Sequence, residues 1–208
     1  YKGYVGQQIG AKVYRGFPPD KVNKTGYFEI YSEIMEDKGL NPLPTYYPIE
    51  EHASMRKDQL ILTTFKVNVQ SHSRTQNCKW LSEICHDNPA WINPVTAAER
   101  GIADGDLIVV RSEVGEITTK ARVTPAVFPG AVAISNHCGH WMYGRYASSN
   151  PTPAELLAGI PDPDASRIWW KGDNGVHPNW IIPLKSDPIG GQMRWNDTVV
   201  TVEKAAAA

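Results

Sequence analysis

A continuous run of hydrogen-bonding side chains occupies residues 70–77, where the sequence reads QSHSRTQN. Hydroxyl, amide, imidazole and guanidinium groups follow one another without an apolar residue between them. Arg74 within the run and Lys66 just before it add fixed positive charge. This combination of donors and cations suits a phosphorylated or polar heterocyclic ligand. A solvated loop has a similar composition, so the run alone leaves both interpretations open.

A second polar and aromatic run follows the apolar segment 131–135 and extends to residue 146. Because neighbouring strands of a closed barrel can end at one rim, we expect His137 and Arg145 to approach the same pocket as residues 71–75. In the alternative interpretation this second run faces another domain, with its aromatic rings as interface side chains.

The cysteines Cys78, Cys85 and Cys138 are odd in number and contain no CxxC pair. The sequence therefore predicts no disulfide framework and leaves the redox compartment undetermined. With His86 and His140 they could form a zinc site, but the spacing matches no zinc finger or ribbon. The sequence shows no nucleophile–base–orienter set and no glycine-rich phosphate motif that opens a helix. We therefore assign no catalytic residue and no metal ligand.

Composition excludes several classes of protein. At 208 residues the chain is long enough to bury a sizeable core. Hydrophobic residues make up 41% and charged residues 21%, which argues against a disordered chain. No apolar run approaches the ~20 residues needed to span a bilayer. The formal net charge of −1 argues against a general nucleic-acid binder, so any anion site must be local.

A predicted strand directly precedes the polar run and determines where the run begins. Residues 60–69 have the aliphatic, aromatic and β-branched side chains of a buried strand, without Gly or Pro. Gly101 and Gly105 are expected at left-handed or tight turns. Further strands are predicted at residues 91–92, 107–110, 117–123, 131–135 and 198–202. Short strands joined by Gly/Asp turns are typical of a small closed barrel rather than a parallel α/β sheet.

Two short helices are predicted between these strands. Residues 79–84 form one, with Trp80, Leu81 and Ile84 on a single apolar face. Residues 96–100 form the other, with Thr96 as its N-cap. Upstream of the strands the core pattern is weak, and the expected elements are an irregular arm, a short strand, a helical turn and a Pro-rich linker at residues 1–22, 27–32, 34–39 and 41–48.

Several segments, in chain order, resemble the C-terminal cofactor-binding domain of the molybdenum or tungsten oxidoreductases of the dimethyl sulfoxide reductase superfamily. KTGYFEIYSE at residues 24–33 resembles the lead-in strand SGKIELYSE, and LTTFK at residues 62–66 resembles LTTGR. QSHSRTQN at residues 70–77 resembles the HTHSRTQN loop of the polysulfide and thiosulfate reductase branch.

The resemblance continues to the end of the chain. INP at residues 92–94, with AAERGIADGD at residues 97–106, resembles INPxDAxxRGIxDGD. DPIGGQ at residues 187–192 and DTVVTV at residues 197–202 resemble the end of the tetrathionate and arsenate reductases. The match covers most of residues 24–204.

The resemblance implies a mainly β fold with short helices: a double-psi β-barrel of the aspartate-decarboxylase-like kind with long wrapping arms. It also implies that the barrel binds one or both molybdopterin guanine dinucleotides of a bis-molybdopterin enzyme, with molybdenum or tungsten, that reduces a sulfur or arsenic oxyanion or polysulfide. Where the family has Gly and Arg in LTTGR, this chain has Phe65 and Lys66, so the guanine-side contacts need not be the usual ones. The cofactor-binding residues expected are Thr64, Lys66, Ser71, His72, Ser73, Arg74, Thr75, Gln76, Asn77, His137, His140, Trp141, Arg145, Asn179 and Gln192.

On this interpretation residues 1–58 are an N-terminal arm and lead-in strand that continue from a missing upstream catalytic region. Residues 59–204 are the molybdopterin dinucleotide-binding barrel with a C-terminal extension, and residues 205–208 are an artefact. An iron–sulfur cluster is expected only in the missing upstream region. The expected partners are the upstream domains, an iron–sulfur electron-transfer subunit and a membrane-anchor subunit, with no nucleic acid. Their setting would be anaerobic respiration at the periplasmic or exported face of a membrane.

Two other functions stay open at this point. A stand-alone barrel enzyme of the decarboxylase-like type needs a processing or catalytic nucleophile, which the sequence does not show. A carbohydrate-binding module would use stacking aromatic rings, but the 7 Trp are scattered along the chain. Guanine dinucleotide that co-purifies with the protein would distinguish the molybdopterin interpretation from both.

Overall fold

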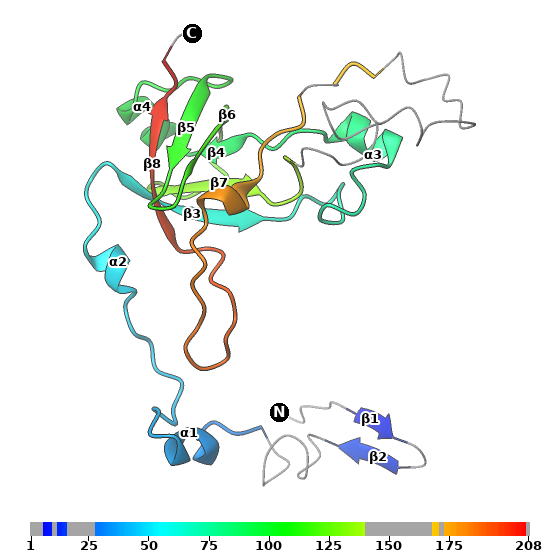
Figure 1. The fold of residues 1–208 in the computed structure, drawn as a ribbon, viewed down its shortest axis with the longest axis vertical. Coiled ribbons are helices and arrows are strands. Elements are labelled where there is room, and N and C mark those ends of the chain that lie inside the picture. The colour runs from blue at the N-terminus through cyan, green and yellow to red at the C-terminus, as the bar shows by residue number, and fades with distance from the viewer. Residues whose placement is uncertain (1–5, 10–11, 16–27, 140–167, 171–172, 207–208) are drawn as a thin grey trace. The chain divides into compact units, whose positions relative to one another are not determined.

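The computed structural model describes residues 6–9, 12–15, 28–139, 168–170 and 173–206. The chain divides into two compact units, Tyr1–Ile49 and Glu50–Ala208. A β-hairpin lies in the first unit and a closed β-barrel in the second (Figure 1).

The first unit contains more regular structure than its sequence predicts. β1 (Gly6–Ile9) pairs antiparallel with β2 (Lys12–Arg15), so the segment expected to be an irregular arm includes a hairpin. α1 (Glu33–Asp37) begins after the N-cap Ser32, whose side chain accepts a hydrogen bond from the Met35 amide. This helix corresponds to the predicted helical turn.

The strand expected at residues 27–32 is not formed in its described part, residues 28–32. Phe28 and Ile30, which produce the alternating pattern, are both exposed. Alternation leads to a strand only where a neighbouring strand supplies hydrogen bonds, and no described strand pairs with this segment. The chain turns into α1 instead.

The second unit is built around a closed barrel of β-strands. The strands are β3 (Gln59–Phe65), β4 (Ala90–Ile92), β5 (Leu107–Arg111), β6 (Glu116–Val123), β7 (Ala131–Ser135) and β8 (Thr198–Lys204). Their order around the barrel is β3-β7-β4-β6-β5-β8 (Figure 1). The predicted closed, mainly β fold is confirmed, whereas the double-psi detail stays a prediction.

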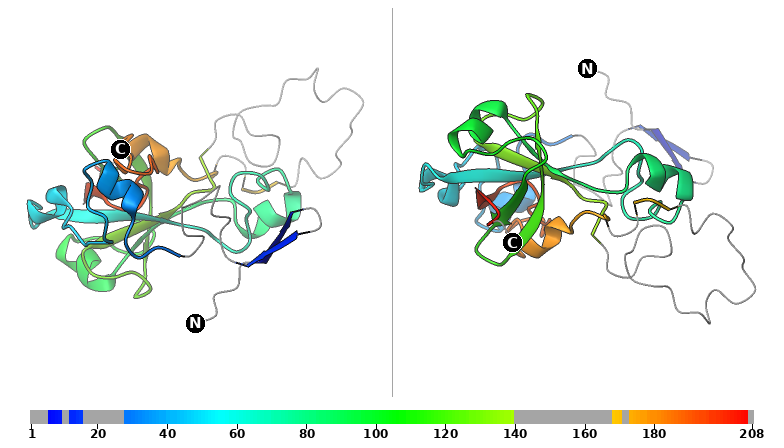
Figure 2. Two further views of the ribbon diagram at one scale, coloured as in Figure 1. Left: turned by 90° about the horizontal axis from the view of Figure 1, so that it is seen from below. Right: turned by 90° about the horizontal axis from the view of Figure 1, so that it is seen from above.

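Strand directions decide which connections meet at each end of the barrel. β3 pairs parallel with β7, so the segments that leave these two strands begin at the same end. β4 runs antiparallel to β7 and β8 runs antiparallel to β3, so the segments that enter β4 and β8 lie at that end too. Figures 1 and 2 show α3 (Lys79–Ile84) beyond this end and α4 (Pro94–Glu99) at the opposite end.

Alternate side chains of the strands fill the barrel interior. In β6 every second residue from Ile117 to Ala121 is buried, and the others face outward. Burial of a Leu, Ile or Val side chain stabilises a fold by about 1.5–3 kcal/mol. Each strand contributes a residue that is at most 3% exposed: Leu62, Ile92, Ile108, Ala121, Val132 and Val200.

α4 begins earlier than its sequence predicts. Its N-cap is Asn93, whose side chain accepts a hydrogen bond from the Val95 amide at 2.9 Å. Proline occupies the first helical position, where its missing N–H leaves no hydrogen bond unmade. Thr96, the predicted cap, is buried, and its hydroxyl accepts a hydrogen bond from the Gly130 amide instead.

α3 has the predicted bounds, but of its predicted apolar face only Leu81 is partly buried. Trp80 is 78% exposed and Ile84 is 70% exposed. Ser82 is the buried residue of this helix, and its hydroxyl donates a hydrogen bond to the carbonyl of Gln76 at 2.6 Å. The helix therefore turns a polar side toward the preceding loop.

The remaining short helices are α2 (Glu50–Ala53) and η2 (Pro178–Ile181). β3 ends at Phe65, so Val67 and Val69 lie outside the strand that was expected to include them. The chain turns there, because the Val67 carbonyl accepts a hydrogen bond from the amide three residues later. No helix within the described ranges combines the length and the apolar character needed to cross a membrane.

Candidate functional site at one rim of the barrel

Two loops leave the barrel at the same end because β3 and β7 are parallel neighbours. Phe65 and Ser135, the last residues of these strands, are register partners. The Asn136 amide continues the pairing with a hydrogen bond to the Phe65 carbonyl at 3.2 Å. Hydrogen bonds also connect residues 85–89 and 173–177 to this end. We call the rim the set of residues 66–78, 85–89, 136–139 and 173–177.

Hydrogen bonds within the loop 66–78 define its shape. The Thr75 hydroxyl donates to Gln70 Oε1 at 2.6 Å and accepts from the Ser71 amide at 2.8 Å. Gln70 Nε2 donates in turn to the Cys85 carbonyl at 2.8 Å. Part of the polar run predicted to bind a ligand is therefore used to support the loop itself.

The other side chains of the run stay accessible. Ser71, His72, Arg74 and Asn77 are exposed, and Ser73 is partly buried. His72 has a φ of 52° and is the only non-glycine residue with positive φ in the described part of the chain. Such a conformation is uncommon for a residue with a Cβ and occurs often at ligand-binding sites.

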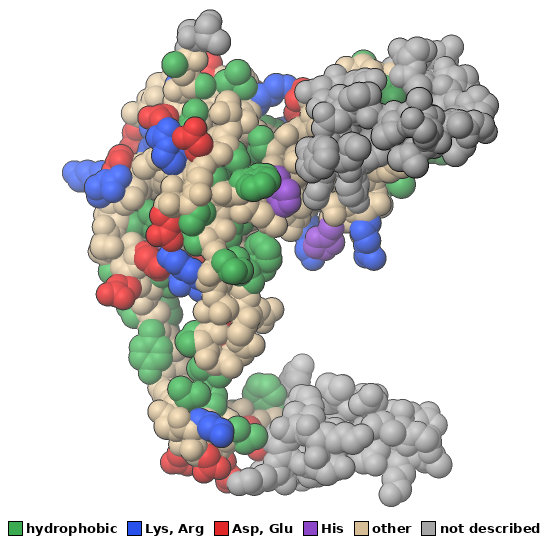
Figure 3. All heavy atoms as spheres, viewed as in Figure 1, with side chains coloured by type: hydrophobic (Ala, Val, Ile, Leu, Met, Phe, Trp, Pro, Cys, Tyr) green, Lys and Arg blue, Asp and Glu red, His purple; other side chains and the backbone are tan. Residues whose placement is uncertain are grey.

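Positive charge gathers on this loop. Lys66 and Arg74 are exposed, and no described acidic side chain pairs with either. By contrast, Arg56, Arg111 and Arg194 each have a carboxylate oxygen within 3.1 Å. Figure 3 shows Lys or Arg and His side chains gathered beside the loop that follows β3. Unpaired cations next to exposed donors favour an anionic ligand.

His137 lies at the same rim, with its ring in the interior. The residue is 1% exposed, with Nδ1 2.8 Å from Ser135 Oγ and Nε2 3.5 Å from Cys85 Sγ. Burial lowers the pKa of His137 to about 4 and raises the pKa of the Cys85 thiol. Both groups are therefore neutral around neutral pH. This arrangement resembles a nucleophile–base–orienter set, but a neutral thiol beside a neutral imidazole is not an activated nucleophile.

A third segment, residues 173–177, is tied to the loop after β7 and to the segment before β4. The Gly139 amide donates a hydrogen bond to the Asn174 carbonyl at 3.0 Å. The side chain of Asn88, in the segment before β4, connects the end of β7 at Ser135 with this third segment. Four stretches of chain that are distant in sequence thus meet at the rim.

Some predicted site residues lie outside the rim. Thr64 is on β3, where its amide and hydroxyl both donate to Asn196 Oδ1. Asn179 is exposed in η2, just after the rim. Gln192 is exposed in the loop before β8, which Figure 1 shows extending away from the loop 66–78. The predicted residues outside the described part of the chain are His140, Trp141 and Arg145.

Asn88, Cys85 and Asn136 are rim residues that were not among the predicted site residues. Asn136 Oδ1 is buried and has no hydrogen-bond partner. Buried acceptors of this kind are rare in folded proteins and call for a partner. The available signal was position, because Asn136 directly follows one apolar strand and Asn88 lies two residues before another. Polar residues at such boundaries are common, so the signal is weak without the fold.

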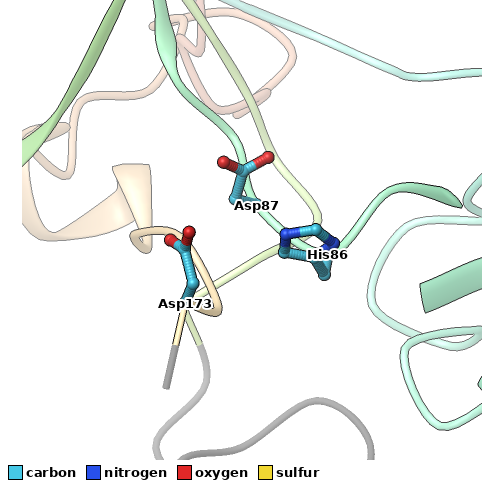
Figure 4. A group of neighbouring side chains, drawn as sticks. All are labelled: His86, Asp87 and Asp173. Atoms are coloured by element: carbon cyan, nitrogen blue, oxygen red, sulfur yellow. The ribbon is translucent and has the colours of Figure 1, made fainter. Parts of the chain in front are cut away.

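His86, Asp87 and Asp173 bring potential metal-ligand atoms within 4.8 Å of one another (Figure 4). All three are partly buried. The Lys120 ammonium already lies 2.5 Å from the Asp173 carboxylate and provides a positive charge there. The His86 ring also packs edge-on against Trp169, with 4.8 Å between ring centroids. We therefore assign no metal to this cluster.

The cysteines do not assemble the zinc site considered above within the described residues, where the cluster of Figure 4 is the only group of potential ligands. Cys78 is exposed. Cys138 is buried, with its Sγ 3.2 Å from the His86 carbonyl, and burial raises the pKa of its thiol. A buried neutral thiol is a poor metal ligand.

A groove of about 1110 Å³ runs along β8 and is lined largely by charged side chains. These charges pair with one another. Lys185 Nζ lies 2.7 Å from Glu51 and 2.8 Å from Glu113, and Arg194 lies 3.1 Å from Glu51. The hydrogen bonds from Lys185 and Arg194 lower the pKa of Glu51 to about 2. The lining includes no rim residue and leaves little unpaired charge, so we do not assign the groove to the ligand.

Comparison with known proteins identifies the barrel. The family model described as molydopterin dinucleotide binding domain matches residues 60–199. This segment begins in β3 and ends in β8, so the match includes the rim, the strands β4 to β7, most of β3 and the start of β8.

Curated relatives are much longer than this chain. It is 28% identical over 214 residues to dimethyl sulfoxide reductase DmsA of Escherichia coli (strain K12), an alignment that covers 96% of this chain and 23% of the relative. It is 34% identical over 169 residues to the thiosulfate reductase molybdopterin-containing subunit PhsA of Salmonella typhimurium (strain LT2), with 80% of this chain and 19% of that subunit covered. The chain thus spans less than a quarter of either relative.

A solved structure supports the fold. Acetylene hydratase from Pelobacter acetylenicus superposes with a TM-score of 0.65 at 20% sequence identity. The superposition covers 88% of this chain and 24% of that protein. At this identity the likeness concerns the fold alone.

Proposed function

This chain belongs to the molydopterin dinucleotide binding domain family, and from that premise we propose that its rim holds molybdopterin guanine dinucleotide in a bis-molybdopterin oxidoreductase. The enzyme is of the dimethyl sulfoxide reductase type and carries molybdenum or tungsten. This chain is its cofactor-binding part, and the metal ligand belongs to another part of the enzyme.

The residues of the rim fit this ligand. A pyrophosphate needs cations and hydrogen-bond donors, and Lys66, Arg74 and Ser71 offer both at the surface of the loop 66–78. Guanine and pterin edges carry N–H donors as well as acceptors. The buried Oδ1 of Asn136 is an acceptor that lacks a partner within the chain. An N–H group of the ligand would satisfy it and remove a cost of about 1–3 kcal/mol.

When bound, the cofactor supplies the oxidation–reduction chemistry. The residues of this chain bind and orient it. The cations of the loop 66–78 neutralise the phosphates, and His72 offers an imidazole at the surface. His137, neutral and held between Ser135 and Cys85, supports the rim from inside and adds no charge there.

The substrate we propose is a sulfur or arsenic oxyanion or polysulfide. The resemblance of residues 70–77 to the loop of the polysulfide and thiosulfate reductase branch supports this choice, as does the thiosulfate reductase among the relatives. The partners we propose are the remaining domains of the same enzyme, an iron–sulfur electron-transfer subunit and a membrane-anchor subunit. The proposed setting is anaerobic respiration at the periplasmic or exported face of a membrane.

The parallel pairing of β3 and β7 carries the proposal. It gives one rim both the unpaired cations Lys66 and Arg74 and the unpartnered acceptor of Asn136. No other described surface combines exposed cations without acidic partners and a buried acceptor without a donor.

Chemical analysis of the full-length enzyme that contains this chain tests the proposal. The protein is purified from cells that make the cofactor, and its guanine nucleotide, pterin and metal are measured. We expect about two guanine nucleotides per protein, one for each dinucleotide of the bis form. Folded protein without guanine nucleotide would contradict the proposed function. Reduction rates with thiosulfate, polysulfide, arsenate and dimethyl sulfoxide test the substrate separately, and a clear preference for the last would overturn that part alone.

A further inference from the structure

Asn88, two residues before β4, joins separate segments of the rim through one side chain. The residue is 2% exposed. Its Nδ2 donates to the Ser135 carbonyl at 2.7 Å and to the Val176 carbonyl at 2.8 Å, and its Oδ1 accepts from the Val176 amide at 2.7 Å. Both N–H groups and the oxygen of the buried amide are therefore engaged with the backbone.

The segment that Asn88 holds has no regular secondary structure of its own. Residues 173–177 lie between chain whose placement is not described and η2. Their backbone approaches Asn88 closely, because a Cβ built on Gly175 would lie 2.1 Å from Asn88 Oδ1. The segment leads directly into Asn179, a predicted cofactor contact. The Asn88 amide therefore helps to place this stretch at the rim, together with the hydrogen bond from Gly139 to Asn174 and the ion pair of Asp173 with Lys120.

We propose that Asn88 is a positioning residue for the dinucleotide: its side chain holds residues 173–179 against the end of β7 in the arrangement that the bound cofactor requires. This inference rests on the proposed function. Asn88 does not contact the ligand, since its polar atoms are engaged with Ser135 and Val176. If cofactor binding and the Asn88 hydrogen bonds favour the same arrangement of residues 173–179, each must stabilise the other to the same extent.

The amide chemistry makes specific substitutions informative. Asn88→Asp keeps an acceptor for the Val176 amide but replaces the donor group with an oxygen that faces two carbonyls. Asn88→Leu removes all three hydrogen bonds at similar volume. Both changes leave the exposed residues of the loop 66–78 untouched.

Asn93 provides a matched control at the other end of β4. It is also a buried asparagine, 8% exposed, whose Nδ2 donates to the Val127 carbonyl at 2.8 Å and whose Oδ1 accepts from the Val95 amide. Asn93→Asp removes a comparable donor on the side of the barrel away from the rim. It should lower stability without changing how the cofactor is held.

The experiment measures dinucleotide release from the full-length holoenzyme at a temperature well below its unfolding midpoint. Guanine and pterin that remain with the protein after timed dilution and gel filtration give the release rate. We expect release to be roughly tenfold faster in Asn88→Asp, as for loss of a buried hydrogen bond, faster again in Asn88→Leu, and unchanged in Asn93→Asp. Equal release rates in Asn88→Asp and wild type, with a lowered unfolding midpoint, would show that Asn88 only supports the fold.

A measurement on the wild-type enzyme keeps the inference testable if the Asn88 variants do not fold. Hydrogen exchange of the Val176 and Gly139 amides is compared between holoenzyme and cofactor-depleted enzyme. We expect slower exchange in the holoenzyme, because a cofactor that requires the Asn88 hydrogen bonds must also stabilise them. Equal exchange in the two forms would overturn the inference. The failure of the proposed function is distinguishable, because wild-type enzyme would then contain no guanine dinucleotide.

Discussion

Phe65 and Ser135 face each other as the last register pair of the parallel strands β3 and β7. The polar residues that follow both strands therefore emerge at one rim, although they are far apart in the sequence. For this reason the exposed guanidinium of Arg74 and the buried imidazole of His137 lie at the same end of the barrel. An antiparallel pairing would have placed them at opposite ends of the barrel.

Arg74→Ala is expected to weaken cofactor retention in the full-length enzyme. Loss of a hydrogen bond to a charged group typically costs about 1.5–3 kcal/mol, and Arg74 has no acidic partner within the described chain that would be left unpaired. Guanine and metal content per folded protein measures the effect. Lys57→Ala, which removes an exposed cation from the groove along β8, should leave both contents unchanged. Full occupancy in Arg74→Ala would return the loop to a merely solvated role.

Gly105→Val is expected to destabilise the fold without altering the rim. Gly105 has a φ of 85°, in the left-handed region, as predicted for this turn and for Gly101 with its φ of 63°. A Cβ on Gly105 meets no atom within 4 Å, so the cost is conformational, about 1–2 kcal/mol. Thermal unfolding measures it against Ala126→Val, an exposed position outside the left-handed region. An unchanged midpoint in Gly105→Val would rule out this backbone conformation.

His137 should make the protein less stable in mild acid. Burial lowers the pKa of His137 in the folded state from 6.5 to about 4. Between these values the unfolded chain binds a proton that the folded protein does not. The stability is therefore fully present above about pH 6.5 and falls, by an amount on the order of 3 kcal/mol, as the pH drops to 4.

Denaturant unfolding across this range compares wild type with His137→Gln. The variant cannot titrate at this position, so its free energy of unfolding should depend less on pH between 6.5 and 4. Identical slopes for the two proteins would mean that the buried imidazole is not the group responsible.

Gly139→Ala should separate residues 173–177 from the rest of the rim. A Cβ on Gly139 would lie 2.1 Å from the backbone of Val176 and His177, which are packed against it. Gly130→Ala is a matched control, because Gly130 also has positive φ, 88° against 82° at Gly139, but a Cβ there meets nothing within 4 Å. The amide of residue 139 donates a hydrogen bond to the Asn174 carbonyl. We expect faster hydrogen exchange of this amide and faster cofactor release only in Gly139→Ala. Equally fast cofactor release in both variants would mean that the positive φ, and not the contact with residues 176 and 177, causes the change.

The strands and turns of the barrel are largely readable from local pattern. β7 and α3 have the predicted bounds, and β5, β6 and β8 differ from the predicted ranges only at their ends. Strand identity here depends on the alternation or density of apolar side chains within a few residues, which the chain carries locally. The family resemblance, which depends on short motifs in order, also needed no coordinates.

The errors occur where a specific hydrogen bond competes with the residue pattern of a helix. Thr96 has the chemistry of an N-cap, but Asn93 and the proline after it start the helix, and the Thr96 hydroxyl binds the Gly130 amide. Trp80 and Ile84 have helical spacing, yet they face outward because Ser82 anchors α3 to the preceding loop. The contact of Thr96 is with a residue 34 positions away, and that of Ser82 is with the loop just before its helix. Each outweighs a propensity worth less than about 1 kcal/mol.

The polar run at residues 70–77 could be recognised from its residue types, but not the division of labour within it. Hydrogen-bonding capacity is a property of each side chain, and the sequence contains it. A side chain such as Gln70 forms its hydrogen bonds inside the protein, whereas one such as Arg74 stays exposed at the surface. Which of the two occurs depends on the backbone that lies within about 3 Å. Parallel pairing of β3 with β7 brings the cysteine, histidine and asparagine partners of the rim to that distance. Such pairing is a long-range choice, made by barrel closure and the burial of six strands together, and no short stretch of sequence encodes it.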